Sequence, residues 1–308
     1  MLRSRNENLG YIYGLIGVIV FALTLPATRV AVRTLDPVFV GLGRVVGAAL
    51  LGGAYLLITR QRRPSLGEFR SLIIVALGGA LGFPLLTAWA MRHVDASHGG
   101  VVLGILPLAT VVAGVIINGE RPSMRFWLFA LLGTVLVVGY SVMRAGGALV
   151  WADVALLGAV AAAAMGYAQG ARLARSMGGL PVISWALVIA APVLVLPAAM
   201  AAPPNLQWPA EAWIAFIYVM VMSQFLGFVP WYRGLALGGV AKVSQVQLLQ
   251  PFLTLLASAW WVGESADAMT WLVAVLVVAL VAIGKSSQVA GVPSRQVQGS
   301  RHREHGKC

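Results

Sequence analysis

The residues best able to do chemistry are polar side chains set inside long apolar stretches. Five residues recur at steps of three and four, which places them on one face of a helix: Ser244, Gln247, Pro251, Thr254 and Ser258. Pro251 also leaves the carbonyl of Gln247 without its usual partner, because proline has no N–H to donate. The stripe predicts a face that binds a polar substrate and water or, alternatively, one that packs closely against another helix.

The segment around Pro251 has a counterpart earlier in the chain. QPFLTLLASAWWVGE and LPLATVVAGVIINGE share Pro, Thr, Ala and the Gly-Glu pair without a gap. Pro107 and Glu120 are 13 positions apart, and so are Pro251 and Glu264. We expect each glutamate to end a helix and orient the following turn. The equal spacing predicts an internal repeat.

Aromatic and amide side chains within other apolar stretches are further candidates for substrate contact. They are Phe83 with Thr87 one turn on, Tyr167, and Gln224 with Phe228. Stacked rings would suit a substrate with a planar apolar part. Packing between helices is the alternative for each of them.

Small and polar residues near the paired prolines predict how a cavity is shaped and closed. Gly100 and Gly104 would widen a cavity or let a neighbouring helix approach. His98 lies nine residues before Pro107, and Lys242 lies nine before Pro251. We therefore expect Ser97 and His98 to mark the outer mouth of the cavity and Lys242 to mark the inner one.

Charged and aromatic residues near helix ends have simpler expected roles. Arg44 lies about two turns into its stretch, so we expect it to extend to the outer interface or to form a structural pair rather than contact substrate. Tryptophan and tyrosine are enriched where helices leave the bilayer. On that basis we expect five residues at the interfaces: Trp89, Trp231, Tyr232, Trp260 and Trp261.

The acidic residues are informative by their positions. All ten Asp and Glu lie in a tail, in a loop or within about two turns of a helix end. A proton-driven antiporter usually needs a carboxylate at mid-membrane. The sequence therefore favours facilitated diffusion, or weak coupling through another group, of which His98 is the one that titrates near neutral pH.

These candidates need helices to position them, and the composition supplies membrane helices. The 308 residues are 59% hydrophobic and only 10% charged, too apolar for a soluble globule. A spanning helix needs about 20 mainly apolar residues, and ten such stretches, which we number as spans 1 to 10, occur at residues 11–32, 38–58, 70–91, 97–118, 126–143, 152–174, 182–201, 211–233, 243–262 and 269–285. We predict an all-α polytopic membrane protein.

The basic residues predict its orientation. With the N-terminus inside, 17 of the 22 Lys and Arg fall in cytoplasmic segments and three in external ones. Both termini are therefore expected in the cytoplasm. The charge of +12 is explained by this topology, so no nucleic-acid partner is expected.

The paired segments divide the chain into two halves of five helices. We expect one repeat at residues 1–148, a second at 149–285 and a disordered cytoplasmic tail at 286–308. Because five is odd, the second half must enter the membrane from the opposite side, which makes the repeats inverted. Inverted repeats are typical of transporters.

At this point the sequence resembles the drug/metabolite transporter superfamily, specifically its ten-helix EamA-type exporters. The resemblance rests on the spacing from Pro37 to Arg44 in DPVFVGLGR and on the two Pro-x12-Glu segments, followed by polar turns in GERPS and GESAD. Among the branches, the sequence looks most like bacterial exporters of aromatic amino acids. The resemblance implies a multi-pass protein of the bacterial cytoplasmic membrane.

The sequence thus predicts a transporter that exports small amphipathic metabolites by alternating access. Aromatic or other neutral amino acids are the expected substrates, and organic cations are a further option through cation–π contact. No cofactor is expected, and a monomer fits although the oligomeric state stays open. A nucleotide-sugar or lipid-precursor transporter is the alternative within the superfamily. A membrane enzyme built on HVDASH, which holds His93, Asp95 and His98, is a distant one.

Overall fold

The computed structural model describes residues 2–118, 124–144, 150–204 and 208–286. The first five spans are built from these elements: α1 (Leu2–Ala22) and α2 (Thr24–Val32); η1 (Phe39–Gly43) and α3 (Arg44–Ile58); α4 (Leu66–Val75), η2 (Ala76–Gly82) and α5 (Phe83–His93); α6 (Ala96–Val102), η3 (Leu103–Ile105) and α7 (Leu106–Asn118); α8 (Met124–Arg144). The other five are α9 (Trp151–Met177); α10 (Gly179–Met200); α11 (Ala210–Ile217), η4 (Tyr218–Leu226) and α12 (Phe228–Gly238); α13 (Val240–Val243), η5 (Ser244–Leu249), α14 (Gln250–Ala257) and η6 (Ser258–Val262); α15 (Ala268–Ser286).

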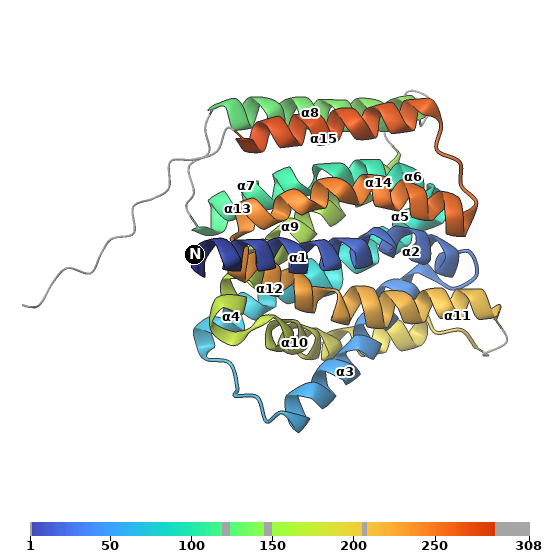
Figure 1. The fold of residues 1–308 in the computed structure, drawn as a ribbon. Helices are drawn as coiled ribbons and strands as arrows, with labels where there is room; N and C mark the ends of the chain where they lie inside the picture. Colours follow the sequence, from blue (N-terminus) through green and yellow to red (C-terminus); the bar gives the residue numbers. More distant parts are fainter. Residues whose placement is uncertain (1, 119–123, 145–149, 205–207, 287–308) are drawn as a thin grey trace, which may run out of the picture.

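The described part of the chain confirms the predicted all-helical membrane fold. Seven helices are long and apolar enough to cross a bilayer. Three shorter apolar helices stand at the positions of predicted spans 5, 9 and 10: Trp127–Val137, Val246–Val262 and Ala268–Leu280. Figure 1 shows the spans side by side in one bundle, with α8 and α15 as a pair along one flank and α3 and α10 towards the other.

The helix contacts follow the symmetry of two inverted repeats. Span 1 packs along span 8 through α1 and α12, and span 6 packs along span 3 through α9 and α5. Spans 2 and 7 pair with each other, as do spans 5 and 10 and spans 4 and 9. If each span is exchanged for its counterpart in the other repeat (span 1 for span 6, span 2 for span 7, and so on), the same set of contacts results. The start of α1 and the end of α15 lie at the same end of the bundle (Figure 1). We call it the inner end because the sequence predicts both termini in the cytoplasm.

Four of the six departures from regular α-helix in the described spans occur at matching places in the two halves, the exceptions being η1 and η6. Wide π-type turns interrupt span 3 at η2 and span 8 at η4. Tight 3-10 segments precede both paired prolines, η3 before Pro107 and η5 before Pro251. A proline lacks the N–H that would continue the helix, so the turn before it is free to change its pitch. These breaks cluster at the centre of the bundle, where the two halves meet.

Two of the predicted interface residues lie instead in the core. Trp231 and Tyr232 are fully buried, whereas Trp260 is 84% exposed and Trp89 is partly exposed. The expectation for Trp231 and Tyr232 was wrong because α12 packs against α1 on one side and against α9 and α10 on others. Nearness to a helix end says nothing about how many neighbours surround that helix.

Glycines bring α1 and α12 into backbone contact. A Cβ atom added at Gly234 would lie 2.8 Å from both the carbonyl oxygen of Gly10 and the amide nitrogen of Gly14, and one added at Gly10 would lie 2.8 Å from Gly238. These distances are shorter than a carbon atom tolerates, and backbone atoms cannot swing away. The small residues therefore set the helix separation, as they often do in membranes.

This contact generates a stability prediction. Gly234→Ala should lower the free energy of unfolding by about 1–3 kcal/mol, because α1 and α12 must move apart. Gly139→Ala is the matched control, since a Cβ at Gly139 in α8 meets nothing within 4 Å. Thermal unfolding in detergent measures both variants. Equal midpoints for the two variants would contradict the role of the contact.

Candidate functional site

A closed cavity lies at the centre of the bundle, between the two repeats. Its wall comes from spans 1, 2, 3, 6, 8 and 9 and consists of Phe21, Thr24, Arg44, Gly79, Phe83, Ala163, Tyr167, Ser223, Gln224, Phe228 and Gln250. The space open to the centre of a water-sized molecule is only about 10 Å³. It is narrow, so that little more than a water molecule fits until the side chains move apart. The conformation is thus contracted around a site with both polar and aromatic walls.

A larger and more open hollow lies between α7 and α9, with about 290 Å³ open to the centre of a water-sized molecule. Its lining is entirely apolar: Ile105, Leu108, Ala109, Val112, Ala113, Ile116, Ala161, Ala164 and Met165. No side chain there can orient a polar ligand by hydrogen bonding. The central cavity is therefore the better candidate for recognition.

Four of the predicted substrate-binding residues lie on the cavity wall: Phe83, Tyr167, Gln224 and Phe228. Phe83 and Phe228 each follow a wide turn, η2 and η4 respectively. The same turns bring Gln224 towards Gly79, so that the amide of Gln224 donates to the Gly79 carbonyl at 3.0 Å. The two halves are thus joined by a hydrogen bond on the cavity wall.

Span 9 faces inwards as its polar stripe predicts, but the stripe does not line the cavity. Ser244, Gln247, Thr254 and Ser258 are all buried, with at most 2% exposed, and Pro251 is buried as well. Gln250 reaches the cavity in place of Gln247. Gln250 lies three residues after Gln247 and four before Thr254, so it belongs to the same broad helix face as the stripe.

The remaining predicted binding residues have packing contacts in this conformation. Thr87 donates to the carbonyl of Phe83 in its own helix at 2.7 Å. A Cβ at Gly100 would lie 2.8 Å from Thr254, and one at Gly104 would lie 3.3 Å from Pro251. Pro107 is buried in the same region. Gly100 and Gly104 thus let spans 4 and 9 approach, which was one of their two expected roles.

Arg44 is the main correction to the sequence analysis. It is fully buried, and none of its three guanidinium nitrogens has a hydrogen-bond partner among the described residues. The expectation that Arg44 reaches the outer interface is wrong, because η1 and α3 carry it between α5, α10 and η4. Its guanidinium carbon lies 6.0 Å from the centre of the Phe83 ring. Arg44 therefore belongs to the cavity.

Sequence reasoning missed six wall residues: Phe21, Thr24, Gly79, Ala163, Ser223 and Gln250. Two of them could have been found from the sequence, because Ser223 and Gln250 are polar residues directly before the candidates Gln224 and Pro251 in apolar spans. Thr24 and Ser223 share a hydrogen bond of 2.8 Å between their hydroxyl oxygens. That bond joins span 1 to span 8 across the cavity.

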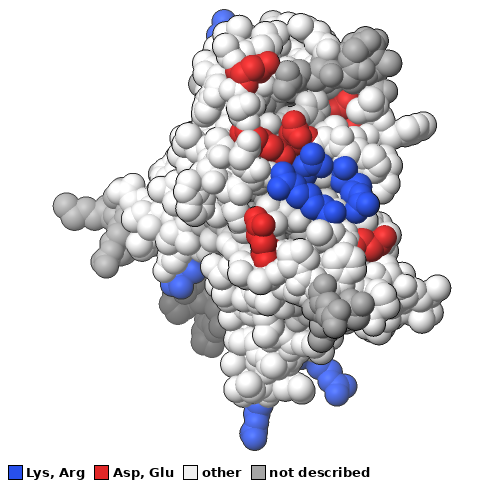
Figure 2. Space-filling view, turned by 90° about the vertical axis from the view of Figure 1, so that its right-hand side faces the viewer, with Lys and Arg blue, Asp and Glu red and all other residues white. Residues whose placement is uncertain are grey.

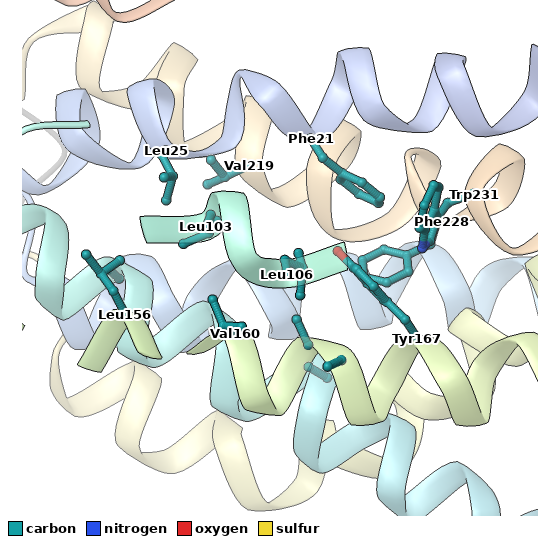
Figure 3. Close-up of a cluster of buried hydrophobic side chains, with 14 of the residues drawn as sticks. Phe21, Leu25, Leu103, Leu106, Leu156, Val160, Tyr167, Val219, Phe228 and Trp231 are labelled. Carbon is teal, nitrogen blue, oxygen red and sulfur yellow. The ribbon is translucent and has the colours of Figure 1, made fainter. Parts of the chain in front are cut away.

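A cluster of aromatic rings closes the inner side of the cavity. Figure 3 shows Phe21, Tyr167, Phe228 and Trp231 converging from α1, α9 and α12. The ring centres of Phe21 and Phe228 are 5.1 Å apart, and those of Tyr167 and Trp231 are 5.5 Å apart. Both pairs are arranged edge to face. Edge-to-face pairs are a favourable arrangement of aromatic rings. The inner barrier is therefore apolar and made of side chains that can change rotamer.

An ionic network closes the outer end. Arg29 donates to Glu264 at 3.2 Å, to Asp95 at 3.1 Å and to the carbonyl of Met91 at 2.7 Å. Glu264 also accepts the backbone N–H of Ala96 at 2.8 Å. Figure 2 shows basic side chains at the centre of this face with acidic ones around them. The network ties span 1 to the loops before span 4 and after span 9.

Glu264 therefore does more than end its helix. It follows Gly263, whose φ of 72° turns the chain at the end of η6. Its second oxygen receives the N–H groups of Ala96 and Ser97 at the start of α6, where a helix favours negative charge. Burial, and then the nearby Asp95, raise the pKa of the Glu264 carboxyl, whereas the Ser97 N–H and Arg29 oppose that shift.

His98 forms a second polar contact near the outer end. Its Nε2 lies 2.6 Å from Oδ1 of Asp153 in the first turn of α9, and both side chains are buried. The two histidines and the aspartate of HVDASH thus have separate partners, since Asp95 pairs with Arg29 and His93 contacts the Trp89 carbonyl. Among the described residues, no group of three or more His, Cys, Asp or Glu could hold a metal ion.

The predicted gate residues are placed unequally. Ser97 lies in the outer network through its backbone, and His98 lies beside that network. The side chain of Lys242 and the whole of Glu120 lie outside the described residues. The inner mouth thus stays a prediction.

Loss of Arg29, the cation of the outer ionic network, should loosen the outer end. Arg29→Gln leaves Asp95 and Glu264 without their counter-charge, so we expect a several-fold faster labelling of the cavity from outside. The readout is modification of Ser223→Cys by an impermeant maleimide in a Cys308→Ser background. Arg33→Gln is the control, because Arg33 is on the same face and forms no ion pair among the described residues. Equal rates for the two variants would contradict this role.

The raised pKa of Glu264 predicts the sign of a pH effect. A carboxyl with a higher pKa in the closed state than in water binds protons more tightly in the closed state. Acidification outside should therefore favour closure and slow cavity labelling, normalised to an exposed Ala202→Cys. Glu264→Gln should remove this component. Faster normalised labelling at acidic pH would refute the assignment.

Comparison with known proteins agrees with the inverted repeat. The model of the EamA-like transporter family matches the chain twice, at residues 8–142 and 150–283. The chain is 46% identical over 250 residues to the uncharacterized transporter YdeK of Bacillus subtilis (strain 168), covering 80% of this chain and 86% of that protein. It is 27% identical over 255 residues to a probable terminal-alkyne amino-acid exporter of Streptantibioticus cattleyicolor, covering 80% and 83%.

A solved structure shares the fold. It has a TM-score of 0.62 and 19% sequence identity, and the match covers 91% of this chain and 96% of that one. That similarity concerns architecture alone. With two matched copies of the family model and a relative of high identity over most of both chains, the protein belongs to the EamA-like transporter family.

Proposed function

We propose that the protein exports small amphipathic metabolites with a neutral amino-acid head group, most naturally aromatic or other apolar amino acids. The observation that carries this proposal is the central cavity, which combines four aromatic rings with hydroxyl and amide groups. Such a wall suits a molecule with an apolar body and a polar end. The amino-acid exporter among the similar proteins agrees with this chemistry.

The mechanism that fits is alternating access across the repeat interface. The cavity lies between an ionic outer closure and an aromatic inner closure, and each closure contains groups from both repeats. Rocking one repeat against the other would open the two closures in turn. The loading side would be the cytoplasm, where the termini lie in the proposed topology, and the membrane would be the bacterial cytoplasmic membrane.

We propose uniport rather than proton antiport. No carboxylate lies on the described wall of the cavity, so the substrate site itself lacks the acid that a proton exchanger uses. The paired Asp153 and His98 lie near the outer end. Transport should thus proceed down the substrate gradient without an imposed proton gradient.

A nucleotide-sugar transporter is the second candidate, and Arg44 is the observation in its favour. A phosphate needs cationic donors within the cavity, and Arg44 supplies one. A diphosphate carries more negative charge than one guanidinium neutralises. Arg29, a second basic residue set within a span, is committed to Asp95 and Glu264. The cavity therefore suits a single negative charge better.

Reconstitution in liposomes tests the proposal. We expect uptake of tryptophan and phenylalanine without a pH gradient, slower uptake of alanine and none of a nucleotide sugar. A quaternary cation tests the option of cation transport. Uptake that occurs only with a pH gradient would refute uniport, and uptake of the nucleotide sugar alone would favour the second candidate.

A cavity variant tests the site. Phe228→Ala removes a ring from the wall and should reduce tryptophan uptake about tenfold, because aromatic contacts and buried area are lost. Trp260→Ala is the control, since that ring is 84% exposed. Equal uptake by the two variants, at equal protein content in the liposomes, would contradict the cavity assignment.

A further inference from the structure

Arg44 presents hydrogen-bond donors that the described protein does not use. Its side chain is fully buried, it lines the central cavity, and Nε, Nη1 and Nη2 all lack a partner. A guanidinium stays protonated in proteins and offers donors in a fixed planar fork. A charge removed from water without compensation is strongly unfavourable. The site therefore calls for a negative group to enter the cavity.

The cavity wall does not provide that group. The ring of Phe83, at 6.0 Å, lies at the limit of a cation–π contact. The other polar wall residues are hydroxyls and amides. A carboxylate matches the guanidinium fork in shape and charge, because two parallel hydrogen bonds can form.

Gln250 presents the complementary feature. Its Oε1 is buried without a partner, on the same cavity wall. An amide oxygen is an acceptor, so it can accept a hydrogen bond from an ammonium group. The neighbouring polar groups already have partners, since Gln224 donates to Gly79 and Thr24 pairs with Ser223. The fully buried side-chain atoms of the described wall that lack a partner are thus the three guanidinium nitrogens of Arg44, which form an anion-binding fork, and the acceptor Oε1 of Gln250.

The rest of the wall defines the space for the body of the ligand. The rings of Phe21, Tyr167 and Phe228 lie 5.1–6.3 Å apart from centre to centre. They flank the narrow space together with Phe83. An apolar side chain could insert between them when the rings change rotamer.

We propose that Arg44 binds the carboxylate of the transported substrate and that Oε1 of Gln250 accepts a hydrogen bond from its ammonium group. The substrate class is then an amphipathic α-amino monocarboxylate, and the carboxylate is the required part. This inference rests on the proposed function, because it concerns the same cavity. It assigns Arg44 a direct role in binding instead of a structural one.

The wild-type protein tests the head-group requirement with ligands that share one indole body. Tryptophan has both groups, indole-3-propionate has only the carboxylate, and tryptamine and tryptophan amide have only the amine. Displacement of labelled tryptophan from the protein in liposomes gives their relative affinities. We expect tryptophan to bind best, indole-3-propionate next, and both amines about tenfold or more weaker than tryptophan.

Variants assign the two interactions. Arg44→Gln should weaken the binding of tryptophan and of indole-3-propionate about tenfold or more and leave the binding of tryptamine unchanged. Arg44→Lys keeps the charge without the planar fork, so its affinity for tryptophan should lie between those of the wild-type protein and Arg44→Gln. Gln250→Leu should weaken the binding of tryptophan but not that of indole-3-propionate, which has no ammonium group. Arg63→Gln is the charge-matched control, because Arg63 is exposed and lies far from the cavity in the loop between spans 2 and 3.

The outcomes separate this inference from the proposed function. Equal affinity of wild-type protein for tryptophan and tryptamine would overturn the carboxylate site while leaving transport intact. An unchanged preference in a folded Arg44→Gln protein would overturn it as well. If none of the indole compounds binds or moves, the proposed substrate class fails, and the inference fails with it. The wild-type comparison decides the matter even if the Arg44 variants do not fold.

Discussion

The absence of hydrogen-bond partners in the bilayer is the constraint on which the whole structure depends. Every polar group within the spans must find a partner in the protein. Thr28, Thr87 and Thr110 meet this condition by donating to the carbonyl four residues earlier in their own helices. Thr254 meets it by donating to the carbonyl of Ala22 in span 1 at 2.9 Å. Several buried neutral groups, such as the amide of Gln247 and the hydroxyl of Ser258, have no partner among the described residues. Arg44 differs from them because its unpaired group carries a full charge, which is far more costly to bury and therefore marks a site.

The inverted repeat explains where such exceptions can occur. Wide turns in spans 3 and 8 and tight turns in spans 4 and 9 break the regular helices at related positions, so the breaks gather around one axis. Irregular backbone at membrane depth is tolerated where it lines a cavity or is covered by protein. The symmetry is one of architecture only. Arg29, Asp95 and Glu264 form an ionic outer closure, whereas aromatic rings close the inner side.

Much of the fold could be predicted from the sequence, because membrane helices are read from length and hydropathy. The cavity could be predicted only in part. Phe83, Gln224 and Phe228 were found because each stands out within an apolar span. Gln250 was missed because the neighbouring Pro251 fits the same spacing between Gln247 and Thr254 and was assigned to the polar stripe instead. Arg44 was misjudged for another reason. Its depth along the helix is visible in the sequence, whereas the neighbours that bury it depend on tertiary packing.

The charge of Arg44 also bears on how the uncoupled export that we propose would complete its cycle. An unpaired guanidinium destabilises the contracted empty cavity, and a bound carboxylate would relieve that cost, so loading would stabilise the closed intermediate through which the protein must pass. A zwitterion carries no net charge, and the same arginine stays with the protein in both directions of the cycle. The loaded and the returning steps would then move equal and opposite charge. Transport of such a substrate would follow its concentration gradient alone, as the lack of a carboxylate on the described cavity wall also suggests.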